Sequence, residues 1–165
     1  MESTNRLALP LLSPGQSQKE IIHNEALQRL DTLVNATVEE PPLTGPPASV
    51  SQGQSFIVGS GATGAWIGRE NCIATWSSGG WRFAAPTDGM AVYVRSKGVT
   101  AAFHEGAWDI GTLRANRVFV GGMQVVGPRQ NAIPDPTGGT AVDGEARLVV
   151  AAILDALRAH GLVAP

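Results

Sequence analysis

The chain has little of what several common protein classes require. Only 16% of its 165 residues are charged, and its 12 basic residues are scattered along the chain. Because nucleic-acid binding needs clustered Lys and Arg, no nucleic-acid partner is expected. Cys72 is the single cysteine, which excludes an intrachain disulfide and a cysteine-based zinc site.

Long apolar runs are also missing. The longest apolar stretches fall far short of the roughly 20 residues that span a bilayer, so no membrane insertion is expected. Residues 1–6 have neither the basic patch nor the apolar run of a signal peptide. The chain is therefore predicted to be made in the cytosol.

Glycine and proline are abundant instead, with 20 Gly and 11 Pro, which favours short strands joined by tight turns. The predicted class is α+β, with an N-terminal helix, a small Trp-rich antiparallel β module, a β-hairpin and a C-terminal helix. The expected parts are an extended segment and helix (1–40), a Pro-rich linker (41–54), the β module (55–112), the hairpin (113–130), and a connector with an oligomerisation helix (131–165).

The first helix is predicted to begin near Ser13 and to end near Ala36. Ser13 can cap it, Pro14 suits its first position, and Gln16 completes a capping box. Apolar residues then recur at spacings of four, four and three, which predicts one buried face. They are Ile22, Ala26, Leu30 and Leu33.

The β module is predicted from short segments that are rich in aromatic and β-branched residues. They are Ser55–Val58, Cys72–Trp76, Trp81–Ala85, Ala91–Arg95 and Val99–His104. All four tryptophans fall in this region, and most are expected to form its core. Sugars bind exposed aromatic rings by stacking on their faces. Trp66 and Trp108 lie at the less regular ends of the module, where exposure is expected. With Arg69 and His104, which could hydrogen-bond hydroxyls, they are the candidate glycan-binding residues.

Arg117–Val120 and Met123–Val126 flank Gly121-Gly122 and predict a tight hairpin. The last helix is predicted from about Asp143 to His160, with Thr140 or Asp143 as its cap, and its apolar stripe has a heptad-like spacing. The stripe either packs on the chain's own β module or forms a bundle with copies of itself. The second alternative is favoured because the hairpin also needs a partner. The candidate oligomerisation residues are Val150, Ile153, Leu154 and Leu157.

Enzymatic chemistry is not indicated. The segment Gly59–Gly64 matches the dinucleotide pattern G-x-G-x-x-G, but no helix is predicted directly after it to hold a pyrophosphate. It is interpreted as a turn, and no cofactor, metal site or catalytic residue is predicted. Glycan hydrolysis would need paired carboxylates, and the sparse acidic residues show no such arrangement.

Several segments together resemble a known family. They are Gly15–Glu20, His23–Leu27, Leu30-Asp31, Ala62–Trp66, Ile73–Trp76, Gly80–Phe83, Val126–Gln130 and Leu157–Leu162. They resemble an uncharacterised domain family that occurs in phage tail proteins and in the head-spike proteins of gene transfer agents. Four polar residues of this pattern, Gln16, Lys19, Asn24 and Asp31, are expected to bond linker or strand-edge backbone that would otherwise be unpaired.

The resemblance implies a virion protein, assembled in the bacterial cytoplasm, that helps a particle to attach to its host. The expected partners are copies of the chain, as a trimer or pentamer, the capsid, tail or fibre proteins, and host surface polysaccharide. The preferred function is a non-enzymatic spike or fibre base. The alternative is a carbohydrate-binding module that binds capsular or cell-wall polysaccharide directly.

Overall fold

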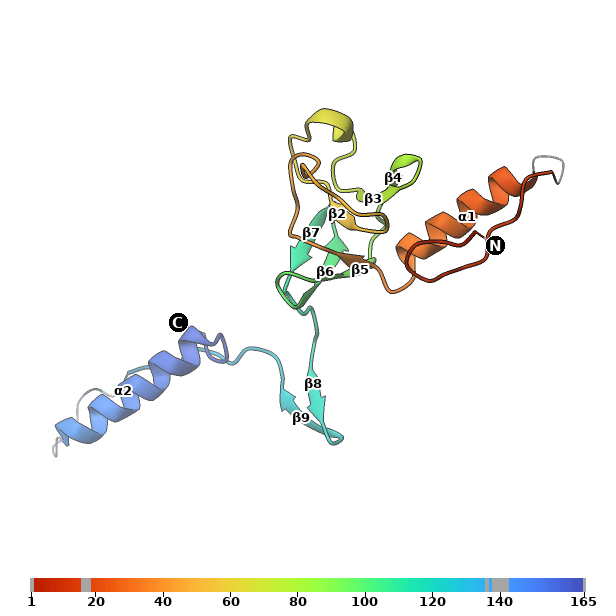
Figure 1. Ribbon diagram of the computed structural model, residues 1–165. Helices are drawn as coiled ribbons and strands as arrows, with labels where there is room; N and C mark the ends of the chain where they lie inside the picture. Colours follow the sequence, from red (N-terminus) through yellow and green to blue (C-terminus); the bar gives the residue numbers. More distant parts are fainter. Residues whose placement is uncertain (1, 16–18, 136, 138–142, 165) are drawn as a thin grey trace. The chain divides into compact units, whose positions relative to one another are not determined.

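The computed structural model describes residues 2–15, 19–135, 137 and 143–164, and the chain divides into two compact units, Met1–Thr112 and Leu113–Pro165. The elements, labelled in Figure 1, confirm the α+β class. Unit 1 contains α1 (Lys19–Leu33), β1 (Thr37–Val38), β2 (Ser55–Ile57), the 3₁₀ helix η1 (Gly64–Trp66), β3 (Ile73–Ser77), β4 (Gly80–Ala84), β5 (Ala91–Val94), β6 (Val99–His104) and β7 (Ala107–Ile110). Unit 2 contains β8 (Val118–Val120), β9 (Met123–Val126) and α2 (Gly144–Ala159).

The strands of unit 1 form two sheets, in the orders β1-β5-β6-β7 and β2-β3-β4. The five strands predicted in the module are present, with ends shifted by at most a residue or so. The sequence did not predict β1, which pairs in parallel with β5, or β7, which pairs with β6. The β1-β5 pair is parallel, and every other strand pair within the two sheets, β6-β7 included, is antiparallel.

The β2-β3-β4 sheet has a hydrophobic cluster on each face. Successive side chains of a strand point to opposite faces, so Phe56 and Ile57 of β2 enter different clusters. Ile57 joins the valines of the other sheet, among them Val92 and Val94. Phe56 packs with Val58, Ala74 and Trp66. This sheet is therefore the central layer of unit 1.

The Pro-rich segment 41–54 is part of this packed unit, whereas the sequence predicted a linker. The Leu43 amide donates to the Ile57 carbonyl (3.0 Å), and the Gly59 amide donates to the Leu43 carbonyl (2.7 Å). The side chains of Leu43 and Val50 pack against the cluster around Phe56. Prolines are compatible with this course because the segment runs along the edge of a strand instead of through a sheet.

The start of the first helix was predicted wrongly. Ser13, Pro14 and Gly15 are not helical, and Gly15 has a φ of +109°, which lies outside the helical region. Ser13 therefore does not cap the helix, which is described from Lys19 onward. Gln16 lies outside the described residues.

The predicted buried face of α1 is also wrong, because polar residues occupy the side of the helix that is buried. Asp31 and Thr32 are the buried residues of α1, whereas Ile22 is 79% exposed and Leu30 is 49% exposed. The Thr32 hydroxyl donates to the Thr75 hydroxyl of β3 (3.2 Å). Of the predicted apolar stripe, only Leu33 packs against the core. The stripe of Ile22, Ala26 and Leu30 faces solvent.

Two polar side chains of α1 bind the N-terminal segment, which runs beside the helix in Figure 1. The Asn24 amide pairs with both backbone groups of Leu12, as donor and as acceptor. The Asp31 carboxylate accepts hydrogen bonds from the Thr4 hydroxyl (2.7 Å) and from the amides of Arg6 (3.0 Å) and Leu7 (2.6 Å). Asn24 and Asp31 thus bond backbone as expected, although the backbone is that of the N-terminal segment. Lys19 is exposed and forms no such bond within the described part of the chain.

Arg6 completes this anchor at the end of α1. Its guanidinium donates to the carbonyl oxygens of Asp31, Thr32 and Asn35. The last carbonyls of a helix have no partner within the helix, so this side chain satisfies groups that would otherwise need water. The N-terminal segment and α1 therefore stabilise each other by reciprocal polar contacts.

Unit 2 agrees with its local sequence signals. The hairpin β8-β9 turns at Gly121 and Gly122, which both have positive φ values of 56° and 80°. Asp143 caps α2 by accepting from the Ala146 amide (3.0 Å). Gln130 pairs with the backbone at Leu162 and Ala164, which ties the connector to the chain end.

We predict that Asp31→Ala destabilises unit 1 by about 3 kcal/mol, since it leaves the Thr4 hydroxyl and two backbone amides without their acceptor. Urea unfolding followed by tryptophan fluorescence measures the change. The control, Asp88→Ala, removes an exposed carboxylate of the same unit and should stay within about 0.5 kcal/mol of wild type. Equal stability of the two variants would contradict the anchoring role of Asp31.

Candidate functional site

Three of the four tryptophans form one aromatic cluster on β3, β4 and η1. The ring centroids of Trp66 and Trp81 are 5.0 Å apart, and those of Trp76 and Trp81 are 5.1 Å apart, both in edge-to-face geometry. Phe56 lies 6.1 Å from the rings of Trp66 and Trp81. Edge-to-face pairs of this kind add about 1 kcal/mol each to the burial of the rings. The cluster is a structural core.

The structure corrects the prediction that Trp66 is exposed, because its side chain is fully buried. It comes from a Gly-rich loop that folds over the β2-β3-β4 sheet, where Leu43 and Val50 also pack. Trp108 is half-buried on the opposite face of that sheet, against the cluster that contains Ile57. Its indole N–H donates to the Asn71 carbonyl (2.9 Å), so this tryptophan too has a packing role.

The two polar candidates contact other side chains, and with Trp66 buried the four candidates share no exposed surface. The Arg69 guanidinium lies 5.2 Å from the centre of the Phe83 ring, in cation–π geometry. His104 is half-buried, and its Nε2 lies 3.8 Å from a carboxylate oxygen of its neighbour Glu105. The structure therefore does not assemble a glycan site from Trp66, Trp108, Arg69 and His104.

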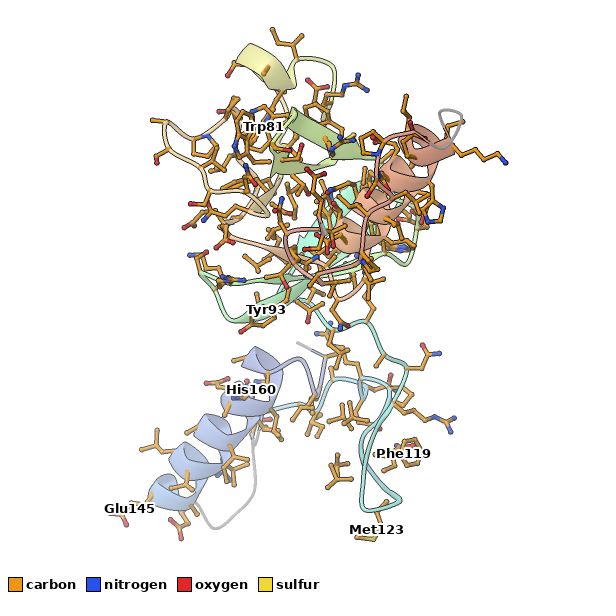
Figure 2. The ribbon with its side chains drawn as sticks, turned by 45° about the vertical axis from the view of Figure 1, so that its right-hand side comes forward. Trp81, Tyr93, Phe119, Met123, Glu145 and His160 are labelled. Carbon is orange, nitrogen blue, oxygen red and sulfur yellow. The ribbon has the colours of Figure 1, made fainter. Side chains whose placement is uncertain are left out.

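A polar groove lies elsewhere, between α1 and β4, with a volume of about 230 Å³. Trp81 of β4, which lines this groove, is labelled in Figure 2. The lining residues are Glu25, Gln28, Arg29 and Thr32 of α1, with Trp81, Arg82, Phe83 and Ala84 of β4. We call this site the α1–β4 groove.

One of the two guanidiniums in the groove is fixed and the other is free. Arg82 forms an ion pair with Glu25, and its Nε donates to the Ser77 hydroxyl (3.1 Å). Within the described part of the chain, Arg29 has neither a hydrogen bond nor an ion pair. The two arginines and one glutamate give the groove an excess of one positive charge. It is suited to a small ligand that carries a single negative charge.

The sequence did not predict the groove, although part of its signal was visible. Glu25, Gln28, Arg29 and Thr32 are three and four residues apart, which puts them on one side of a helix. That side could not be matched with β4, because the Glu25–Arg82 pair joins residues 57 positions apart. Only the folded chain shows that β4 closes the groove.

Of the four predicted oligomerisation residues, two are exposed along α2. Val150 and Ile153 are 44% and 54% exposed, and Leu157 is half-buried. Leu154 is buried, so it belongs to the small core of unit 2 and not to a free helix face. Val149 is 60% exposed and adds to the exposed apolar stripe of α2 that contains Val150 and Ile153. Figure 2 labels Glu145 in the first turn of α2 and His160 directly after its last residue.

The described residues contain no group of three or more His, Cys, Asp or Glu side chains that could hold a metal ion. Burial raises the pKa of the Cys72 thiol, which makes it a weaker nucleophile at neutral pH. The loop Gly59–Gly64 leads into η1, which has only three residues. Neither helix in the described part of the chain has the length and hydrophobicity that crossing a bilayer requires.

We predict that Trp66→Ala destabilises the chain by about 4 kcal/mol, because it opens a large cavity in the aromatic cluster. Thermal or urea unfolding measures this loss. Ile67→Ala is the matched control, since Ile67 is adjacent and 71% exposed, and it should change stability by less than about 0.5 kcal/mol. A Trp66→Ala variant as stable as Ile67→Ala would show that the indole is not a core residue.

Comparison with known proteins identifies one family and no curated relative. No curated protein matches the chain. The family described as "Protein of unknown function (DUF2793)" matches residues 23–109, a range that includes most of α1, both sheets of unit 1 and the groove. The match spans just over half of the 165 residues. The chain therefore belongs to the DUF2793 family of proteins of unknown function.

Proposed function

We propose that this protein is a non-enzymatic, self-associating spike or fibre base of a phage or gene-transfer-agent particle. In this role it assembles in the bacterial cytoplasm and contributes to attachment of the particle to the host surface. Two lines support the proposal. One is the sequence resemblance to tail and head-spike proteins described above, and the other is the distribution of apolar side chains in unit 2.

The apolar residues of unit 2 carry the self-association part. Among its described residues, the buried hydrophobic side chains are Leu154 and Val163. Exposed ones include Phe119, Val120 and Met123 of the hairpin, two of which are labelled in Figure 2. A two-stranded ribbon with so little core is marginally stable alone, and an exposed apolar surface of this kind is typical of an interface.

Copies of the same chain are the partner that best fits α2. Ala146, Val150, Ile153 and Leu157 follow spacings of four, three and four, which matches parallel helices packed around a common axis. All four are exposed or half-buried, so they are available for such a contact. The hairpins of the same copies can then pack together next to the helices. Closed cyclic symmetry accommodates a trimer or a pentamer.

The outward stripe of α1 is assigned to a different contact. Ile22, Ala26 and Leu30 belong to unit 1, whereas the residues assigned to self-association belong to unit 2. A second apolar surface on the same chain allows a ring of copies to bind a capsid, tail or fibre protein without opening the ring. We assign the stripe to that docking contact.

Direct binding of host polysaccharide is the second candidate function. The residues first considered for it do not converge, because Trp66 is buried. The observation that favours it is the α1–β4 groove, whose lining combines charged and amide side chains.

We predict that Ile153→Glu converts the oligomer to a monomer, since a buried charge in each copy would face its equivalents around the axis. Multi-angle light scattering on the full chain measures the mass. Ala152→Glu is the matched control, because it adds the same charge to an exposed position on another side of α2. A monomeric wild-type chain, or equal masses for the two variants, would contradict assembly through α2.

We predict that Ile22→Glu prevents binding to particles purified from cells that lack the protein, and that it leaves the oligomeric mass unchanged. Co-sedimentation with those particles measures the binding. Thr87→Glu, at an exposed loop position of unit 1, should bind as wild type does. If the wild-type chain does not sediment with the particles, the particle role is wrong; if Ile22→Glu still sediments, the assignment of α1 is wrong.

A further inference from the structure

We propose that the α1–β4 groove binds an acidic sugar, with the Arg29 guanidinium receiving a uronic acid carboxylate. The inference adds a ligand class and a binding residue to the attachment role, and in that respect it rests on the proposed function. It does not depend on self-assembly, because all of its residues lie in unit 1.

The size of the groove limits the ligand. Its volume of about 230 Å³ is below the range of roughly 300–1,000 Å³ that drug-sized molecules occupy. It therefore admits one small molecule or a single residue of a longer polymer. The groove lies between α1 and the edge strand β4 and is partly open to solvent, so a sugar residue bound in it can belong to a longer polymer.

The charge of the groove selects an anion with one charge. Arg82 is already neutralised by Glu25, so the unpaired Arg29 supplies the net positive charge. A guanidinium presents two parallel N–H groups that match a carboxylate. A phosphate is a poorer match, because its second negative charge would face the Glu25 carboxylate.

The remaining polar groups suit the hydroxyls that surround a sugar carboxylate. The Gln28 amide is both donor and acceptor, and the Glu25 carboxylate has capacity to accept in addition to its contact with Arg82. Arg82 is held by Glu25 and Ser77 before any ligand arrives, so little side-chain entropy is lost on binding. A carboxylate with neighbouring hydroxyls is the chemistry of a uronic acid.

Titration of the full chain with uronic acid trisaccharides tests the inference. The probes are trimers of galacturonate, glucuronate and mannuronate, with maltotriose as the neutral sugar and inorganic phosphate as a sugar-free anion. Isothermal calorimetry should detect at least one uronate trimer and neither of the other two probes. Failure of all three uronates, or equal binding of maltotriose or phosphate, would overturn the proposal.

Substitution of Arg29 locates the site. Arg29→Gln should weaken the uronate complex at least tenfold, and Lys97→Gln, which removes one charge from an exposed turn of the same unit, should leave it unchanged. Both variants should keep the wild-type unfolding midpoint and oligomeric mass, because Arg29 has no partner in the described chain. Undiminished binding by Arg29→Gln would overturn the site. Loss of binding with an unchanged mass would leave the assembly proposal intact.

Discussion

The buried Asp31 carboxylate determines which side of α1 faces the rest of the chain. It collects the Thr4 hydroxyl and two backbone amides of the N-terminal segment, and these groups have to be satisfied when they leave water. The stripe of Ile22, Ala26 and Leu30 lies on a different side of the helix and so turns to solvent. The orientation that exposes this stripe also places Gln28 and Arg29 against β4 and forms the groove.

The two units differ in how much of their apolar surface is buried. Unit 1 has a central sheet with a hydrophobic cluster on each face, and its aromatic residues fill one of these clusters. Unit 2 has a hairpin and a helix whose larger apolar side chains are mostly exposed. Unit 1 thus has a core of its own, whereas unit 2 has few buried apolar side chains among its described residues, and this difference is the physical basis of the assembly proposal.

Features that depend on neighbouring residues could be predicted from the sequence. The hairpin turn follows from two glycines, the start of α2 from the Asp143 cap, and the main strands from runs of β-branched and aromatic residues. The prediction failed where distant contacts decided the outcome. Trp66 was expected at the surface because it lies at a less regular end of the β region, and the packing of the 41–54 segment onto the same cluster was not visible.

The sequence by itself determined the α+β class, the order of the main elements and the existence of two helices, since these follow from local propensity and periodicity. The tertiary structure alone decided that α1 turns polar residues inward, that Leu154 is core while Ile153 is exposed, and that Arg29 and Arg82 line one groove. Periodicity shows that a helix has an apolar side. It does not show what covers that side, because the cover comes from residues far away in the chain.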